Sequence, residues 1–135
     1  PDDQTNEPLF DSTIVYLRFL NRPTLSHDIL QASLTAFKIV FLRHIGLAIH
    51  YPKIDTISSV PPWFSLSNGG FHGGMQMADS QPVSPEIWHK FVELNDWDFN
   101  TPIVLTSSTL PLSDMVSSFV TYQLEREIKS DRFLA

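Results

Sequence analysis

The residues SHDILQASLTAFKIVFLRHIG, at positions 26–46, carry the clearest structural signal in the sequence. Ser26 can cap a helix by accepting hydrogen bonds from its first free N–H groups, and Asp28 places a negative charge in the first turn. Gly46 is suited to end the helix, because glycine readily adopts a left-handed conformation. We expect a central helix, nearly surrounded by its neighbours, whose apolar residues recur at helical spacing: Ile29, Leu30, Leu34, Phe37, Val40, Phe41 and Ile45.

Two further helices are predicted nearer the C-terminus. Ser84-Pro85-Glu86 combines a capping residue, a proline at the first helical position and an acidic residue, which together favour a helix start. The helix that follows has an apolar face of Ile87, Trp88, Phe91 and Leu94. Ser113 is expected to cap the last helix, whose apolar stripe consists of Val116, Phe119, Val120, Leu124 and Ile128.

Short strands are expected around these helices. The segment DSTIVYLRFL, residues 11–20, is dense in β-branched and aromatic residues and favours a strand, with a short helix as the alternative. Asn68-Gly69 is typical of a hairpin turn, so we expect residues 63–67 and 75–78 to pair as antiparallel strands across a glycine-rich tip. The other predicted strands cover residues 47–51, 53–60 and 103–110.

This order of elements predicts a single α+β domain, with a mostly antiparallel sheet packed against about three helices. A chain of 135 residues lies within the usual size range of one domain, and its 42% hydrophobic content can supply a core. We expect the domain to span residues 1–135, with frayed ends at 1–9 and 132–135.

The net charge of −6 is concentrated in the central half of the chain. Residues 54–125 contain eight acidic residues and one basic residue, Lys90, whereas residues 1–53 contain five of each. Such a segment repels phosphate backbones and attracts cationic partners, so we expect no nucleic-acid binding and favour a basic protein partner. The alternative interpretation is a solvated surface that keeps the protein soluble.

All three tryptophans fall within the same acidic segment. Tryptophan is large and amphipathic, which makes it an effective interface anchor. Trp63 follows two prolines and Trp97 stands between Asp96 and Asp98, so we expect both indoles to be partly exposed. Trp88 is expected in the core.

The sequence GGFHGG, residues 69–74, contains four of the five glycines and brackets Phe71 and His72. It can be interpreted as a recognition loop, or as a hairpin that needs glycines for its turn and a bulge. Its spacing matches neither a phosphate-binding P-loop nor a dinucleotide-binding motif. His72, in a loop near acids such as Asp79, is the one weak candidate for acid–base catalysis.

Other kinds of chemistry have no support in the sequence. The absence of cysteine excludes disulfides, thiolate metal sites and a cysteine nucleophile. No histidine or serine lies in a metalloprotease or hydrolase motif, so we predict no metal site and no cofactor. No apolar stretch is long enough to span a membrane, and the lack of cysteine favours a cytoplasmic location.

We therefore predict an acidic protein-binding module that engages a basic protein, in the manner of inhibitors or immunity-type proteins that neutralise cationic enzymes. One alternative is a small-ligand-binding protein or enzyme with an aromatic-lined pocket that uses His72. Another is a structural subunit that forms homo-oligomers through the apolar run 37–42. The predicted binding residues are Trp63, Phe71, His72, Asp79, Asp96, Trp97 and Asp98.

Overall fold

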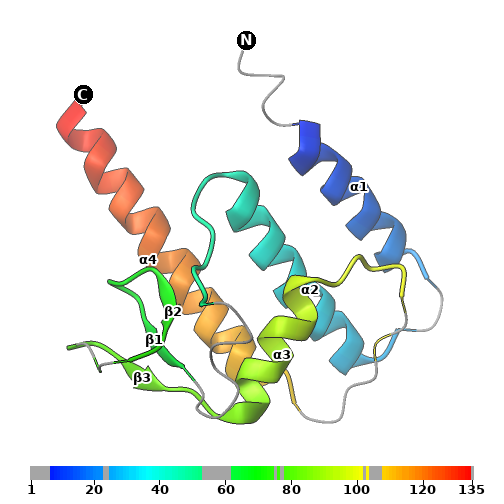
Figure 1. Ribbon diagram of the computed structural model, residues 1–135. Coiled ribbons are helices and arrows are strands. Elements are labelled where there is room, and N and C mark those ends of the chain that lie inside the picture. The colour runs from blue at the N-terminus through cyan, green and yellow to red at the C-terminus, as the bar shows by residue number, and fades with distance from the viewer. Residues whose placement is uncertain are drawn as a thin grey trace.

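The computed structural model is an α+β domain, which confirms the predicted fold class (Figure 1). It describes residues 7–22, 25–52, 62–74, 76, 78–101, 103 and 108–134. In this part of the chain, helices outweigh the sheet, and there are four of them rather than about three. The elements are α1 (Glu7–Leu20), α2 (His27–His44), β1 (Trp63–Ser65), β2 (Gly70–His72), β3 (Gln81–Pro82), α3 (Pro85–Asn95) and α4 (Leu110–Leu134).

Helix α2 is the central element that its sequence predicts. The side chain of Ser26 accepts a hydrogen bond from the N–H of Ile29 at 3.2 Å, and Gly46 follows the helix with a φ of +84°. The helix packs against α1, α3 and α4, and Figure 1 shows it running between α1 and α4. Ile39, Val40 and Leu42 are buried, so this part of the run 37–42 packs inside the domain.

The prediction of a strand at residues 11–20 is wrong, because these residues belong to α1. Helical spacing places Tyr16 and Phe19 on the buried side of α1. The Tyr16 ring stacks on that of Phe37 in α2, with 4.6 Å between the ring centroids. Tertiary packing of this kind outweighs the weak strand preference of individual residues. Helix α1 begins at Glu7, inside the segment that was expected to fray.

The sheet has the strand order β2-β1-β3, and both pairs are antiparallel. The hairpin after β1 forms as predicted, but its second strand is β2, inside the predicted tip, instead of residues 75–78. Gly70 also lets β2 approach the backbone of His50, because a Cβ at this position would lie 2.5 Å from the His50 carbonyl oxygen. The predicted strand 47–51 is reduced to a single bridge between His50 and Gly70, and the one at 53–60 lies outside the described residues.

The last helix starts earlier than predicted. Helix α4 begins at Leu110, so Ser113 lies inside the helix instead of capping it, and the described residues of the predicted strand 103–110 form no strand. The side chain of Ser108 accepts a hydrogen bond from the N–H of Leu110 at 3.1 Å. Pro111 in the first turn also favours this start, because its missing N–H needs no partner there.

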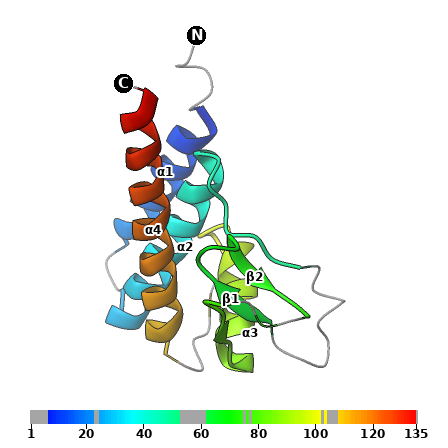
Figure 2. The same cartoon turned by 90° about the vertical axis from the view of Figure 1, so that its left-hand side faces the viewer.

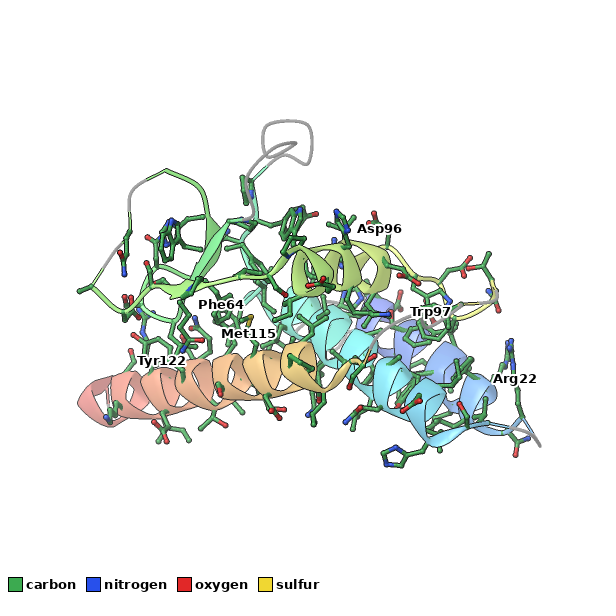
Figure 3. All side chains as sticks on the ribbon, turned by 90° about the horizontal axis from the view of Figure 1, so that it is seen from below. Arg22, Phe64, Asp96, Trp97, Met115 and Tyr122 are labelled. Atoms are coloured by element: carbon green, nitrogen blue, oxygen red, sulfur yellow. The ribbon has the colours of Figure 1, made fainter. Side chains whose placement is uncertain are left out.

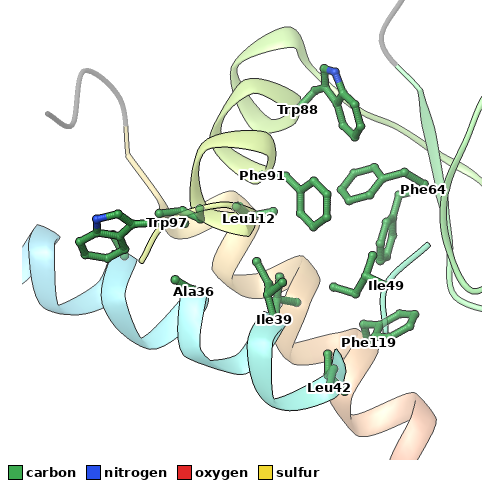
Figure 4. Packing of buried hydrophobic residues seen from close by; sticks show 14 of the residues in the cluster. Ala36, Ile39, Leu42, Ile49, Phe64, Trp88, Phe91, Trp97, Leu112 and Phe119 are labelled. Carbon is green, nitrogen blue, oxygen red and sulfur yellow. The ribbon is translucent and has the colours of Figure 1, made fainter. Parts of the chain in front are cut away.

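Two groups of aromatic side chains contribute to the core. Around α3, Phe91 packs against Phe71 with 4.6 Å between ring centroids, and Trp88 lies beside both. Beside α1, Trp97 packs against Phe19 and Phe99. Figure 4 shows the α3 group and Trp97 at separate places in the core. Figure 2 shows α3 and the sheet together on one side of the longer helices, so the outer side of α3 faces away from that bundle.

Candidate functional site

Helix α3 has one apolar side and one acidic side. Glu86, His89, Glu93 and Asp96 are all exposed and lie three or four positions apart, so they share one face. We call the three acidic residues, Glu86, Glu93 and Asp96, the acidic stripe. Figure 3 shows Asp96 at the end of α3, on the side away from α2 and α4. The opposite side of α3 buries Trp88, Phe91 and Leu94.

The carboxylates of the acidic stripe are unpaired within the described residues. Within the described residues, no ion pair or side-chain hydrogen bond engages Glu86, Glu93 or Asp96. Lys90 is the one basic residue between positions 54 and 125, and it is only 4% exposed. Three negative charges therefore stand together on a solvated helix face, where they attract a cationic surface.

An exposed tyrosine lies beside the same helix. The ring of Tyr51 meets that of Phe91 edge-on at 5.5 Å, and its hydroxyl accepts a hydrogen bond from the Asn95 side chain at 3.2 Å. Arg43 in turn donates to the Asn95 oxygen at 2.9 Å. Tyr51 is thus held in place while 45% exposed. Sequence reasoning missed this residue, because it precedes the acidic segment and its position depends on a contact with α3.

Trp97 is buried, contrary to the prediction that it is partly exposed. Its side chain is 8% exposed, and its indole N–H donates to the carbonyl of Thr101 at 2.8 Å. The backbone bends at Phe99, which has a φ of +66°. This bend points the indole inward even though acidic residues flank it in the sequence, and it removes Trp97 as an interface anchor.

Asp98 is exposed, but it stabilises its own loop. Its carboxylate accepts hydrogen bonds from the backbone N–H of Asn100 and from the N–H and hydroxyl of Thr101, at 2.9, 3.1 and 3.2 Å. These bonds, with the Asn100 N–H contributing most, hold the pKa of Asp98 below its usual range. Its negative charge therefore serves the loop that positions Trp97.

The glycine-rich segment is part of the sheet and not a free loop. Phe71 lies in β2, is 4% exposed and packs against Phe64 on β1. His72 pairs across the strands with Trp63, and both are half-buried. The His72 ring is within hydrogen-bond distance of the Ser80 hydroxyl, at 2.9 Å, and it lines none of the cavities described below.

Asp79 fastens the turn between β1 and β2. The hydroxyl of Ser65 and both the N–H and the hydroxyl of Ser67 donate to its carboxylate. The bond from Ser65 is the largest cause that lowers the pKa of Asp79 to about 2. Asp79 is thus tied to the turn, and His72 to Ser80, so the predicted pairing of these two groups for acid–base chemistry finds no direct contact.

The structure therefore divides the predicted binding residues. The 97–101 loop lies next to α1, where Arg22 donates to the Phe99 carbonyl, whereas the hairpin with Trp63 and His72 lies on the other side of α3 (Figure 1). Of the predicted acidic residues, Asp96 alone belongs to the acidic stripe.

One further arrangement resembles catalytic chemistry. Ser12 in α1 and His44 at the end of α2 approach within 3.1 Å, hydroxyl to imidazole Nε2, beside a cavity of about 280 Å³. A nucleophilic serine needs a base that a third group orients. No described carboxylate binds His44, and Asp98, which lines the same cavity, is engaged by its own loop. The contact between Ser12 and His44 therefore links α1 to α2.

Neither a metal site nor a membrane span is found in the described residues. No group of three or more potential ligands is suited to hold a metal ion, and no helix is long and apolar enough to cross a bilayer. Comparisons with models of known families, with curated proteins and with solved structures gave no match to this chain.

Proposed function

We propose that this protein is a binding module that engages a basic protein through the acidic stripe of α3, as inhibitors and immunity-type proteins engage cationic enzymes. One observation carries the proposal: Glu86, Glu93 and Asp96 share an exposed helix face and form no ion pair among the described residues, while Lys90 is buried. Charges arranged this way raise the rate at which an oppositely charged partner is captured.

The candidate anchor for such a partner is Tyr51, which flanks α3 through Phe91 and Asn95 and does not lie on the stripe face itself. Binding energy at interfaces concentrates in a few residues, and tyrosine and tryptophan are common among them. The contacts of Tyr51 with Phe91 and Asn95 fix the ring before binding, which lowers the entropy that docking would otherwise cost. Acidic residues for steering and a rigid aromatic anchor for retention thus lie on one helix and its immediate neighbour.

The proposal can be tested by capture from a lysate of the source cells at low and high salt. Three baits are compared: the wild type, a stripe variant (Glu86→Gln, Glu93→Gln, Asp96→Asn) and a control variant (Asp11→Asn, Glu125→Gln, Glu127→Gln). The control loses the same charge at exposed positions on α1 and α4. We expect a basic protein that the wild type and the control retain at low salt and that the stripe variant loses. Equal recovery by both variants, or retention that is indifferent to salt, would overturn the proposal.

The anchor is tested separately with the captured partner. Tyr51→Ala should speed dissociation about tenfold, because it removes an exposed aromatic contact. Tyr51→Phe keeps the ring and should dissociate nearly as slowly as the wild type. Surface-based binding kinetics measure both rates. If alanine and phenylalanine behave alike, the ring is not the anchor.

A further inference from the structure

A polar cavity lies away from the acidic stripe, between the chain that leaves α2, the turn after β1 and helix α4. Its volume is about 410 Å³, and its polar lining residues include His50, Ser67, Asn68, Gln123 and Arg126. Figure 1 shows the chain after α2 descending beside α4 towards the sheet. A cavity of this size is sufficient for a small organic molecule.

The charge of this cavity is opposite to that of the protein. The chain carries a net charge of −6, yet the ionisable groups among the described lining residues are Arg126 and His50, and none is acidic. Asp79 binds Ser67 but does not line the cavity itself, and neither do Glu125 and Glu127, the neighbours of Arg126 in α4. The guanidinium of Arg126 lies 5.7 Å from the centre of the Tyr122 ring and forms no ion pair within the described residues.

Gln123 supplies a polar group to the wall of the cavity. Its side chain is 7% exposed and lines the cavity. Within the described part of the chain its amide makes no hydrogen bond, and its polar atoms are not among the fully buried ones, so they are accessible from the cavity. The amide can therefore donate to, or accept from, a polar group that enters the cavity.

Gly69 positions His50 at the wall of the cavity. The backbone N–H of His50 donates to the carbonyl of Gly69 at 2.9 Å, which holds the histidine beside the turn. A Cβ at Gly69 would lie 2.8 Å from the His50 ring, and the residue has a φ of +86°. Glycine at this position therefore leaves space for the imidazole at the cavity wall.

We propose that this cavity binds a small molecule that carries a carboxylate. Arg126 pairs with the carboxylate, because the planar guanidinium matches its two oxygens. Gln123 hydrogen-bonds a second polar group of the same ligand, and His50 closes the side of the cavity. A single arginine in an acidic protein suits one carboxylate better than the several charges of a nucleotide phosphate chain.

The test uses N-acetylglycine, which has one carboxylate and one amide, and its uncharged analogue N-acetylglycinamide. Each is titrated into the isotope-labelled full chain and followed by the NMR shifts of backbone amides. We expect N-acetylglycine to shift resonances at positions 46–50, 67–69 and 123–126, with little response to the analogue. Shifts scattered over the surface, or equal shifts with both compounds, would overturn the proposal.

Three variants assign the roles of the residues. Arg126→Gln should weaken N-acetylglycine binding about tenfold, as expected for loss of a charged hydrogen bond. Lys129→Gln removes the same charge from an exposed position of α4 outside the cavity lining and should leave binding unchanged. Gln123→Leu should weaken binding without lowering the melting temperature, because the amide makes no hydrogen bond within the described residues that the folded chain would lose.

Other patterns contradict the assignment. If Arg126→Gln and Lys129→Gln weakened N-acetylglycine binding equally, the loss would come from net charge and not from a contact with Arg126. A fall in the melting temperature of Gln123→Leu with unchanged binding would make Gln123 a structural residue. None of these outcomes depends on the basic-partner proposal, since no residue of the acidic stripe lines this cavity.

Discussion

The carboxylates of the acidic central segment fall into two groups with different tasks. Asp79 and Asp98 each accept three hydrogen bonds from nearby loop residues, so their charges hold the 65–67 turn and the 97–101 loop in shape. Glu86, Glu93 and Asp96 have no such bonds within the described residues. All five contribute equally to net charge, but only the second group is available to a partner. Net charge alone therefore overstates the binding surface.

The largest difference in stability between the two groups of carboxylates is expected when the hydrogen bond between Ser65 and Asp79 is removed. Ser65 is fully buried, donates to Asp79 and accepts a hydrogen bond from the N–H of Asn68 at 3.0 Å. Ser65→Ala leaves that N–H and the carboxylate short of a partner and should cost about 1–3 kcal/mol of stability. Urea unfolding measures the loss.

The matched change on the acidic stripe is Glu93→Gln, which should alter the free energy of unfolding by less than about 0.5 kcal/mol, as for other exposed sites. A similar loss in both variants would show that the two groups of carboxylates do not differ.

The next largest effect concerns the pH dependence of the stability that Asp79 contributes. The folded-state pKa of Asp79 is about 2, below its ordinary value of 3.8. The stabilisation from this group is therefore complete above the ordinary value and is lost as the pH falls towards 2. We expect the wild type to lose more stability between pH 5 and pH 2.5 than Asp79→Asn does, when both are unfolded by urea at each pH. If the free energy of unfolding fell equally with pH in both proteins, Asp79 would not stabilise the turn.

The smallest expected effect is a difference between Asp96 and Asp98, which lie two positions apart in the sequence. Asp96→Asn should slow association with a basic partner about threefold, because it removes a steering charge. Asp98→Asn should instead lower the melting temperature, because its carboxylate accepts the hydrogen bonds of Asn100 and Thr101. Stopped-flow association and thermal unfolding of each variant check the two roles. Exchanged phenotypes would reverse the assignment.

Much of the helical framework could be predicted from local signals. The caps at Ser26 and Ser84 and the terminator Gly46 are where the sequence indicates them. These signals are local because a capping side chain satisfies N–H groups within its own first turn. Residues 11–20 could not be assigned in the same way, since their β-branched and aromatic side chains suit both a strand and a buried helix face, and the packing of Tyr16 on Phe37 decides between them.

The candidate site was predictable only in part. The spacing of Glu86, Glu93 and Asp96 on a well-predicted helix places them on one face, so their grouping follows from the sequence. The inward turn of Trp97 depends on the positive φ of Phe99, and the placement of Tyr51 depends on contacts across 44 positions of chain. Contacts of this range leave no local pattern. The cavity beside Gln123 is equally hidden, because three separate segments build it.

The central claim is that the unpaired carboxylates of α3 steer a basic partner to this surface. Its most direct test is the association rate constant of the captured partner, measured over a range of ionic strength for the wild type and the stripe variant. We predict a steep fall with salt for the wild type, and a slower and nearly salt-independent rate for the stripe variant. Two proteins with the same rate and the same salt dependence would contradict the claim.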